Sequence, residues 1–195
     1  MNQQQEQNDI LGDFTKRLDK IDIEYMLVGS MALVHYALPR TTVDIDIVLK
    51  ILTENIDKFI AEFETDYYIP TGRAKQAASE KGMFNVLNNQ TVLKIDCIIL
   101  KESKFEKNAF SRRQKVNYSG DFNVWIIGKE DLILSKLNWA KNTKSERQMR
   151  DVASIIRNGF NTEYVEKWAK ILDVEKLLEE CFELLEKNYD DGHDS

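Results

Sequence analysis

A small-residue turn and a pair of aspartates, each attached to an apolar strand, most constrain what this chain can fold into. Residues 25–28 are apolar and end at Gly29-Ser30, and a second strand-like run contains Asp44-Ile45-Asp46. Strand side chains alternate between two faces, so Asp44 and Asp46 project from one face, roughly 7 Å apart. The turn would place backbone N–H groups and the positive end of a helix dipole beside an anion. The pattern predicts a divalent metal held next to a phosphate.

Each of these residue types suits that chemistry. Mg²⁺ is a hard cation that binds through one or two carboxylates together with substrate phosphates. Gly29 lets the backbone approach closely, and Ser30 can cap the helix and hydrogen-bond a phosphate oxygen. Each motif alone has an ordinary explanation, since Gly-Ser is common after strands and alternate aspartates often face solvent. Together, between apolar strands, they favour the metal.

A third carboxylate lies in the most strand-like run of the chain, residues 91–100. Asp96 is flanked there by apolar residues, where an unpaired charge would be costly to bury. A metal ion would offset that cost. Lys94, two residues back on the same face, is the alternative partner. We favour the metal, with Asp44, Asp46 and Asp96 around it.

These residues resemble a known superfamily. The apolar strand, Gly29-Ser30, the following helix, Arg40-x-Thr42-x-Asp44-x-Asp46 and the strand with Asp96 are similar to nucleotidyltransferases of the DNA polymerase β type. The resemblance is strongest to bacterial AbiEii-like abortive-infection proteins and small aminoglycoside or lincosamide nucleotidyltransferases. The motifs lie between about residues 25 and 100, and weaker similarity continues to about residue 157.

The resemblance implies a fold, a reaction and residue roles. The fold class is α+β, a mixed β-sheet of the nucleotidyltransferase type flanked by helices, with a C-terminal helical subdomain. Asp44 and Asp46 would bind two Mg²⁺ ions that hold a nucleoside triphosphate such as ATP. Asp96 would be the third metal ligand or the general base. The residues implied to contact the nucleotide or its phosphates are Gly29, Ser30, Arg40 and Thr42.

The resemblance to AbiEii-like proteins extends to two C-terminal helices. Segments 130–137 and 147–151 look similar to theirs and imply Lys136 on the nucleotide and Asp151 as a further polar residue of the site. Ser154 departs from the pattern, because those toxins often carry an acid there. The alternative is that Lys136 and Asp151 are ordinary ions on a helix surface.

Composition excludes several classes of protein. Of the 195 residues, 43% are hydrophobic, which supports a real core. The two cysteines, Cys97 and Cys181, form no disulfide framework, and no apolar run is long enough to span a membrane. We therefore expect a reduced, cytoplasmic protein. P-loop, Rossmann and Cys/His zinc motifs are all missing from the sequence.

Charge is unevenly distributed along the chain. The net charge is −6, yet segments 101–115 and 136–150 are rich in lysine and arginine. Such segments fit a channel for a triphosphate or an RNA end. A solvated helix face is the commoner explanation.

The hydrophobic pattern divides the chain into four parts. We predict a disordered tail at 1–8, a nucleotidyltransferase catalytic domain at 9–128, a helical subdomain at 129–189 and a tail at 190–195. Expected helices are 9–21, 30–37, one beginning with a cap at Thr53, 129–142, 145–158, 162–171 and 173–188; residues 71–82 are either a helix or a mobile loop. Expected strands are 25–29, 44–50, 67–69, 84–87, 91–100, 115–118 and 122–127.

The leading prediction is a Mg²⁺-dependent nucleotidyltransferase that moves a nucleoside monophosphate to a hydroxyl and releases pyrophosphate. The acceptor is a small molecule such as an antibiotic, a tRNA 3′ end or a protein side chain. The alternative is a non-catalytic protein that binds a nucleotide or a partner, such as an antitoxin in a toxin–antitoxin pair. Three retained carboxylates favour the enzyme, because a site without catalytic demand has no obvious use for clustered negative charge.

Overall fold

A computed structural model describes residues 3–37, 44–118, 120 and 122–190, with 186–190 described as backbone alone. Arg40 and Thr42 lie outside these described residues. Contacts between Cα atoms group the chain into two compact units. Unit 1 comprises Met1–Ala32 and Arg40–Ile127, and unit 2 comprises Leu33–Pro39 and Gly128–Ser195. Helix α2 (Gly29–Tyr36) therefore contributes residues to both units, which a division at residue 128 did not anticipate.

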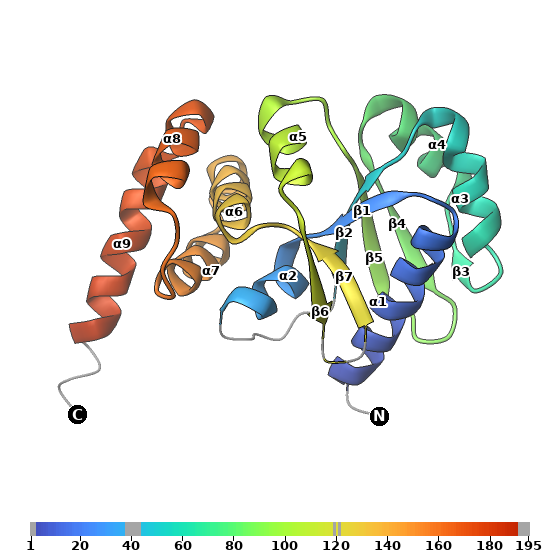
Figure 1. The fold of residues 1–195 in the computed structure, drawn as a ribbon, viewed down its shortest axis with the longest axis horizontal. Helices are drawn as coiled ribbons and strands as arrows, with labels where there is room; N and C mark the ends of the chain where they lie inside the picture. Colours follow the sequence, from blue (N-terminus) through green and yellow to red (C-terminus); the bar gives the residue numbers. More distant parts are fainter. Residues whose placement is uncertain (1–2, 38–43, 119, 121, 191–195) are drawn as a thin grey trace. The chain divides into compact units, whose positions relative to one another are not determined.

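The described part of unit 1 is built on a seven-stranded mixed sheet with the order β3-β4-β5-β2-β1-β7-β6 (Figure 1). The pairs β2–β5 and β1–β7 are parallel, and the other neighbouring pairs are antiparallel. This arrangement confirms the predicted α+β fold class. The strands are β1 (Glu24–Leu27), β2 (Ile45–Lys50), β3 (Tyr67–Tyr68), β4 (Met83–Asn88), β5 (Lys94–Ile99), β6 (Gln114–Tyr118) and β7 (Phe122–Ile126).

One face of this sheet is covered by helices and holds the core of unit 1. The covering helices are α1 (Gln3–Lys20), α3 (Ile56–Phe63) and α4 (Thr71–Glu80). Phe84 of β4 meets Phe59 of α3 edge to face, with ring centroids 5.6 Å apart, and Phe14 of α1 stacks on Phe63 at 4.4 Å. Alternation along β2 follows from this covering: Ile45, Ile47 and Leu49 are fully buried, whereas the residues between them are half-buried. The half-buried residues Asp46 and Val48 belong to the other face of the sheet.

Several local predictions for unit 1 are wrong. Residues 3–8 are not a disordered tail but the first turns of α1, where Gln7 and Asn8 are buried. Thr53 does not cap a helix with its side chain; it begins a short 3-10 turn, η1 (Thr53–Asn55), that leads into α3. Helix α5 (Lys104–Ser111) was not predicted. Ser103 caps it by accepting a hydrogen bond from the backbone N–H of Glu106.

Unit 2 consists mainly of helices whose bounds lie close to those predicted. They are α6 (Lys129–Thr143), α7 (Glu146–Ile156), α8 (Thr162–Leu172) and α9 (Glu175–Asp190). Their apolar stripes recur every three or four residues, and Leu137, Val152 and Ile155 are fully buried. The side chain of Asn158 donates a hydrogen bond to the carbonyl of Tyr36, which joins the end of α2 to this unit. Within the described residues, every helix is too short or too polar to cross a membrane.

Candidate active site

The face of the sheet opposite α1, α3 and α4 carries a row of polar residues on three adjacent strands. Asp46 of β2 pairs in register with Asp96 of β5, and Asp96 pairs with Asn85 of β4. Neighbouring strands lie about 4.8 Å apart, and residues paired across a ladder point to the same side. Asp44 precedes β2, and its carboxylate is about half exposed. The structure therefore brings Asp44, Asp46 and Asp96 to one face, and adds Asn85 to them.

Asp96 is buried, and both of its carboxylate oxygens have protein partners. The Nδ2 group of Asn85 donates to Oδ1 at 2.6 Å, and the Nζ group of Lys94 donates to Oδ2 at 3.1 Å. Hydrogen bonds to an ionised carboxylate are stronger than those between neutral groups. The lysine that the sequence offered as an alternative partner is thus in contact with Asp96.

Lys94 connects two carboxylates of the row. Its Nζ atom lies 3.5 Å from Oδ1 of Asp44, in addition to its contact with Asp96. Partial burial disfavours the charged ammonium, but the hydrogen bond to Asp96 and the charges of Asp96 and Asp44 outweigh this and raise the pKa of Lys94. Lys94 is therefore a cation at physiological pH, held among acids.

Gly29 brings the turn directly against this row. Its φ of +62° belongs to the left-handed region, which glycine adopts without strain. A Cβ atom on this residue would stand 2.0 Å from Oδ2 of Asp46, closer than any real contact. The backbone N–H of Val28 also donates to the carbonyl of Asp46 at 2.9 Å. The Asp46 carboxylate thus packs directly against the backbone of Gly29.

Ser30 lies in the first turn of α2, because the helix begins at Gly29 and not at Ser30. Ser30 is half-buried. The hydroxyl of Tyr118 in β6 donates to the carbonyl of Met31 at 3.0 Å, which fastens this turn to the sheet. The positive end of the helix dipole consequently begins beside Asp46.

The donor set suits a hard divalent cation, although the described residues include no group of three His, Cys, Asp or Glu side chains placed to hold a metal. Asp44, Asp46 and Asp96 supply carboxylate oxygens, the ligands that Mg²⁺ prefers. A positive charge, the Lys94 ammonium, already lies between two of them. These carboxylates thus suit a bound cation, and in this structure the cation beside two of them is the Lys94 ammonium group.

Lys136 and Asp151 form a buried ion pair within unit 2. Nζ of Lys136 lies 2.7 Å from Oδ2 of Asp151 and also donates to Oε1 of Gln148 at 3.0 Å. The two charged side chains are 4% and 5% exposed. The alternative that they are ordinary ions on a helix surface is therefore wrong. Two charges this deep must compensate each other, because an isolated one would lose its hydration.

Sequence reasoning missed two polar residues that have defined partners in the structure, the half-buried Asn85 and the buried Asp131. Asn85, which orients Asp96, looks in sequence like any half-polar strand residue. Asp131 is fully buried in unit 2, where the hydroxyl of Tyr164 donates to its Oδ1 at 2.6 Å. Its position in the first turn of α6 is a common place for an acid, so the sequence gives no sign of burial.

The basic segments are largely engaged with acids of the protein itself. In segment 101–115, Lys107 pairs with Glu102, and Arg113 pairs with Glu24 at 2.6 Å. In segment 136–150, Lys141 pairs with Asp173 at 2.8 Å in addition to the buried Lys136 pair. These contacts compensate part of the positive charge of both segments within the protein itself.

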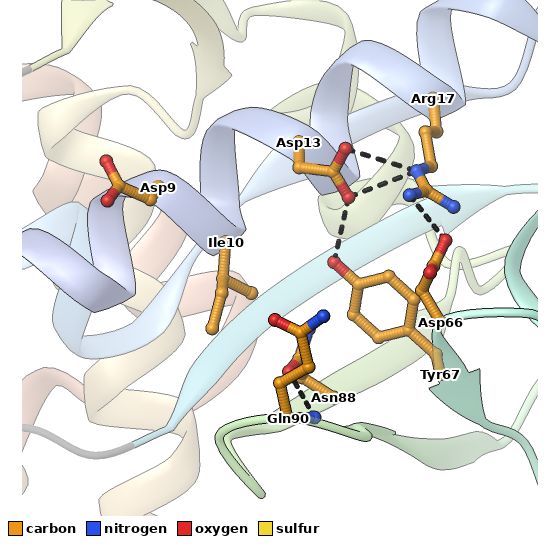
Figure 2. Close-up of a pocket in the computed structure, with 8 residues that line it drawn as sticks. All are labelled: Asp9, Ile10, Asp13, Arg17, Asp66, Tyr67, Asn88 and Gln90. Carbon is orange, nitrogen blue, oxygen red and sulfur yellow. Dashed lines mark hydrogen bonds and ion pairs between the residues drawn. The ribbon is translucent and has the colours of Figure 1, made fainter.

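A separate pocket of about 230 Å³ lies between α1, β3 and the turn from β4 to β5 (Figure 2). Arg17 pairs there with Asp66 at 2.7 Å and Asp13 at 3.0 Å, and Tyr67 donates to Asp13 at 3.1 Å. Asn88 follows Val86 by two residues and Phe84 by four, so it belongs to the helix-covered face of the sheet. The pocket is therefore on the face opposite to the carboxylate row, and the two are distinct.

Comparison with known proteins gives a family and a fold. The family model described as "Nucleotidyltransferase of unknown function (DUF6036)" matches residues 5–180. No curated protein gives a significant match to the sequence.

Solved structures with a similar fold include three nucleotidyltransferase-type proteins. ANT(2")-Ia in complex with adenylyl-2"-tobramycin has a TM-score of 0.60 at 12% identity, covering 86% of this chain and 97% of its own. An antigenic nucleotidyltransferase-like protein from Paracoccidioides brasiliensis has a TM-score of 0.54 at 14% identity, covering 90% and 91%. Lincomycin-bound LnuA, a lincosamide antibiotic adenylyltransferase, has a TM-score of 0.50 at 15% identity, covering 74% and 93%. At these identities the likeness establishes the fold alone.

Proposed function

Because the chain belongs to DUF6036, a family of nucleotidyltransferases of unknown function, we propose that it transfers a nucleoside monophosphate from a nucleoside triphosphate to a hydroxyl group and releases pyrophosphate. The observation that supports this most is the meeting of the turn and the acids: Gly29 lies against Asp46, which stands in register with Asp96. A phosphate-binding turn and metal-binding carboxylates serve one reaction only if they are adjacent.

We assign Asp44, Asp46 and Asp96 to the binding of Mg²⁺, with two ions in the complete site. Bound Mg²⁺ would neutralise charge on the triphosphate and stabilise the attacking and leaving oxygens. Asp96 would serve as the third ligand or as the base that accepts the proton of the acceptor hydroxyl. The hydrogen bond from Asn85 supports either role, because it fixes the orientation of the carboxylate. Phosphoryl transfer depends on such positioning more than on covalent help from the protein.

Gly29 and Ser30 are the proposed contacts for the phosphates, since α2 begins there with its N-terminal dipole. Arg40 and Thr42 remain proposed contacts on the strength of the sequence pattern. Lys136 and Asp151 remain proposed nucleotide-binding residues of unit 2. Contact between Lys136 and a nucleotide would have to compete with its 2.7 Å pairing to Asp151.

For the acceptor we propose a small molecule with a free hydroxyl, such as an antibiotic. Two structural neighbours support this choice, since one was solved with adenylyl-2"-tobramycin and the other with lincomycin. A tRNA 3′ end and a protein side chain are the other acceptors to include in any screen. The competing function, a cytoplasmic nucleotide-binding protein that acts through an antitoxin partner without turnover, is separated from the enzyme by the assays below.

The test begins with pyrophosphate release from each labelled nucleoside triphosphate, with Mg²⁺, against aminoglycosides, lincosamides, tRNA and the protein itself. We expect Asp44→Asn and Asp46→Asn to lower the rate by roughly 100-fold or more, and EDTA to abolish it. Asp57→Asn is the matched control, because this exposed aspartate of α3 pairs with Lys75 and lies on no strand of the row.

Full activity in both aspartate variants would reject the assigned mechanism. Calorimetry with Mg²⁺ and each triphosphate addresses the alternative. Binding of a triphosphate without pyrophosphate release for any acceptor would favour the non-catalytic function instead.

A further inference from the structure

The ammonium group of Lys94 contacts two of the carboxylates on this face of the sheet. It lies 3.1 Å from Oδ2 of Asp96 and 3.5 Å from Oδ1 of Asp44, two of the three carboxylates assigned to the metal. The Lys94 side chain is 35% exposed, so it has room to move towards solvent. Its stem of four methylene groups is flexible.

We propose that Lys94 is a positioning residue that competes with the divalent metal for Asp44 and Asp96, so that metal binding displaces its ammonium group. This inference rests on the proposed function, since it takes the same carboxylates as metal ligands. Lys94 belongs to none of the motifs assigned to phosphate or metal binding.

Charge and geometry both require the displacement. Mg²⁺ binds carboxylate oxygens at 2.0–2.1 Å and demands near-ideal octahedral geometry. A metal that joined Asp44 and Asp96 would stand close to the present position of Nζ, and two cations at that separation repel each other in a partly buried site. The ammonium group must therefore leave at least one carboxylate when the metal binds.

Asn85 would keep the Asp96 carboxylate oriented after the ammonium group of Lys94 leaves. It holds Oδ1 of Asp96 at 2.6 Å, whereas Lys94 holds Oδ2. The amide fixes the orientation of the carboxylate and carries no charge. The lysine compensates the charge and can be exchanged for another cation. The two partners of Asp96 thus have separable effects.

The competition predicts that metal and nucleotide bind together. Without a triphosphate, the metal must overcome the attraction between Lys94 and two carboxylates. With a triphosphate present, the displaced ammonium gains an anionic partner in the phosphates, so part of that cost is recovered. Each ligand should therefore raise the affinity for the other, and the coupling is reciprocal.

The experiment measures Mn²⁺ binding by the loss of the free-ion signal in electron paramagnetic resonance, without and with a non-hydrolysable ATP analogue. The variants are Lys94→Met, Lys94→Gln and Lys94→Arg. The matched control is Lys50→Met. Lys50 is also a strand lysine in an ion pair: it lies at the end of β2 away from Asp44 and pairs with Glu24 of β1. Circular dichroism confirms that each variant is folded.

We expect Lys94→Met and Lys94→Gln to bind Mn²⁺ alone at least tenfold more tightly than the wild type, or about 1.4 kcal/mol. The gain in Mn²⁺ affinity caused by the analogue should shrink several-fold in both. Lys94→Arg and Lys50→Met should resemble the wild type. Unchanged or weaker Mn²⁺ binding in folded Lys94→Met and Lys94→Gln overturns the proposal, as does an absence of Mn²⁺ binding in every variant.

Failure of this inference is distinguishable from failure of the proposed function. Wild-type protein that transfers nucleotide while Lys94→Met shows no change in Mn²⁺ affinity rejects only the competition. Protein that transfers no nucleotide, while Lys94→Met and Lys94→Gln bind Mn²⁺ more tightly than the wild type, rejects only the enzyme.

Discussion

A methyl group on Gly29 would stand 2.0 Å from Oδ2 of Asp46, so the backbone of the turn and the carboxylate of the strand occupy adjoining space that no other residue type would leave open. The two residues lie on different elements, α2 and β2, and the backbone N–H of Val28 donates a hydrogen bond to the carbonyl of Asp46 beside their contact. The contact makes Gly29 a residue of the site in its own right.

We expect Gly29→Ala to lower the free energy of unfolding by about 2–4 kcal/mol, because it adds a steric clash to the strain of a positive φ. Gly120→Ala is the control, since Gly120 has a φ of +82° but nothing within 4 Å of its Cβ position. Backbone strain alone should cost about 1 kcal/mol there. Urea unfolding measures both. Equal losses in the two variants would mean that the contact with Asp46 yields without cost.

The buried pair in unit 2 allows a double-mutant cycle. Removing one charge leaves the other buried and uncompensated, so Lys136→Met and Asp151→Leu should each lower the free energy of unfolding by about 3–5 kcal/mol. The double variant should be less destabilised than the sum of the two, because no isolated charge remains. Additive losses would show that the two residues are not coupled, contrary to their 2.7 Å separation.

Glu24 links strand β1 to Lys50 and Arg113, and its stabilising effect should depend on pH. The hydrogen bond from Lys50, aided by Arg113, lowers the pKa of Glu24 below 4.5 against the opposing effect of burial. A group whose pKa is lower in the folded state stabilises the fold above its ordinary pKa, and this contribution disappears as pH falls through the folded-state value. Glu24→Gln should therefore be less stable than the wild type at pH 7, by up to about 1 kcal/mol for so exposed a pair.

Thermal unfolding of Glu24→Gln and the wild type at intervals from pH 7 to pH 3 checks this. The difference in Tm should shrink below about pH 4.5. Glu54→Gln, the same substitution on the exposed turn η1, serves as the control. A Glu24→Gln difference that stays constant down to pH 3 would contradict the ion-pair origin of the effect.

Both thiols should be unreactive in the folded protein. Burial raises the pKa of Cys181 to about 12 and that of Cys97 well above its ordinary value, and the thiolate is the reactive form. Ellman's reagent at pH 8 should label neither cysteine in native protein and both in urea. Cys97→Ser and Cys181→Ser assign the labelled positions. Rapid labelling of the native protein would place at least one thiol at the surface.

The sequence could predict which residues of a single strand lie on the same face. Period-two patterning tells which side chains of one strand share a face, so Asp44 and Asp46 could be grouped from their spacing alone. Asn85 could not be placed beside Asp96, because that requires the register between β4 and β5, which the length and conformation of their connecting turn determine. The fold class followed from the resemblance of these motifs to the nucleotidyltransferase superfamily.

The burial of Lys136 and Asp151 was beyond reach of the sequence for a similar reason. Each residue has ordinary helical neighbours, and only the packing of α6 against α7 brings them together and removes them from water. The helical start of α1 was missed because the Gln-rich segment has a disordered composition, while tertiary contacts bury Gln7 and Asn8. Local pattern describes an element, and its neighbours decide which of its polar residues are buried.

Helix α2 belongs by its first residues to unit 1 and by its last to unit 2, so the chain has no single peptide bond at which it separates into two self-sufficient pieces. A fragment that ends at Ile127 would keep Tyr36 and lose Asn158, which donates to its carbonyl. We expect gene fusions, insertions and recombination events to preserve the two units together, because each inherits part of its structure from the same eight-residue helix.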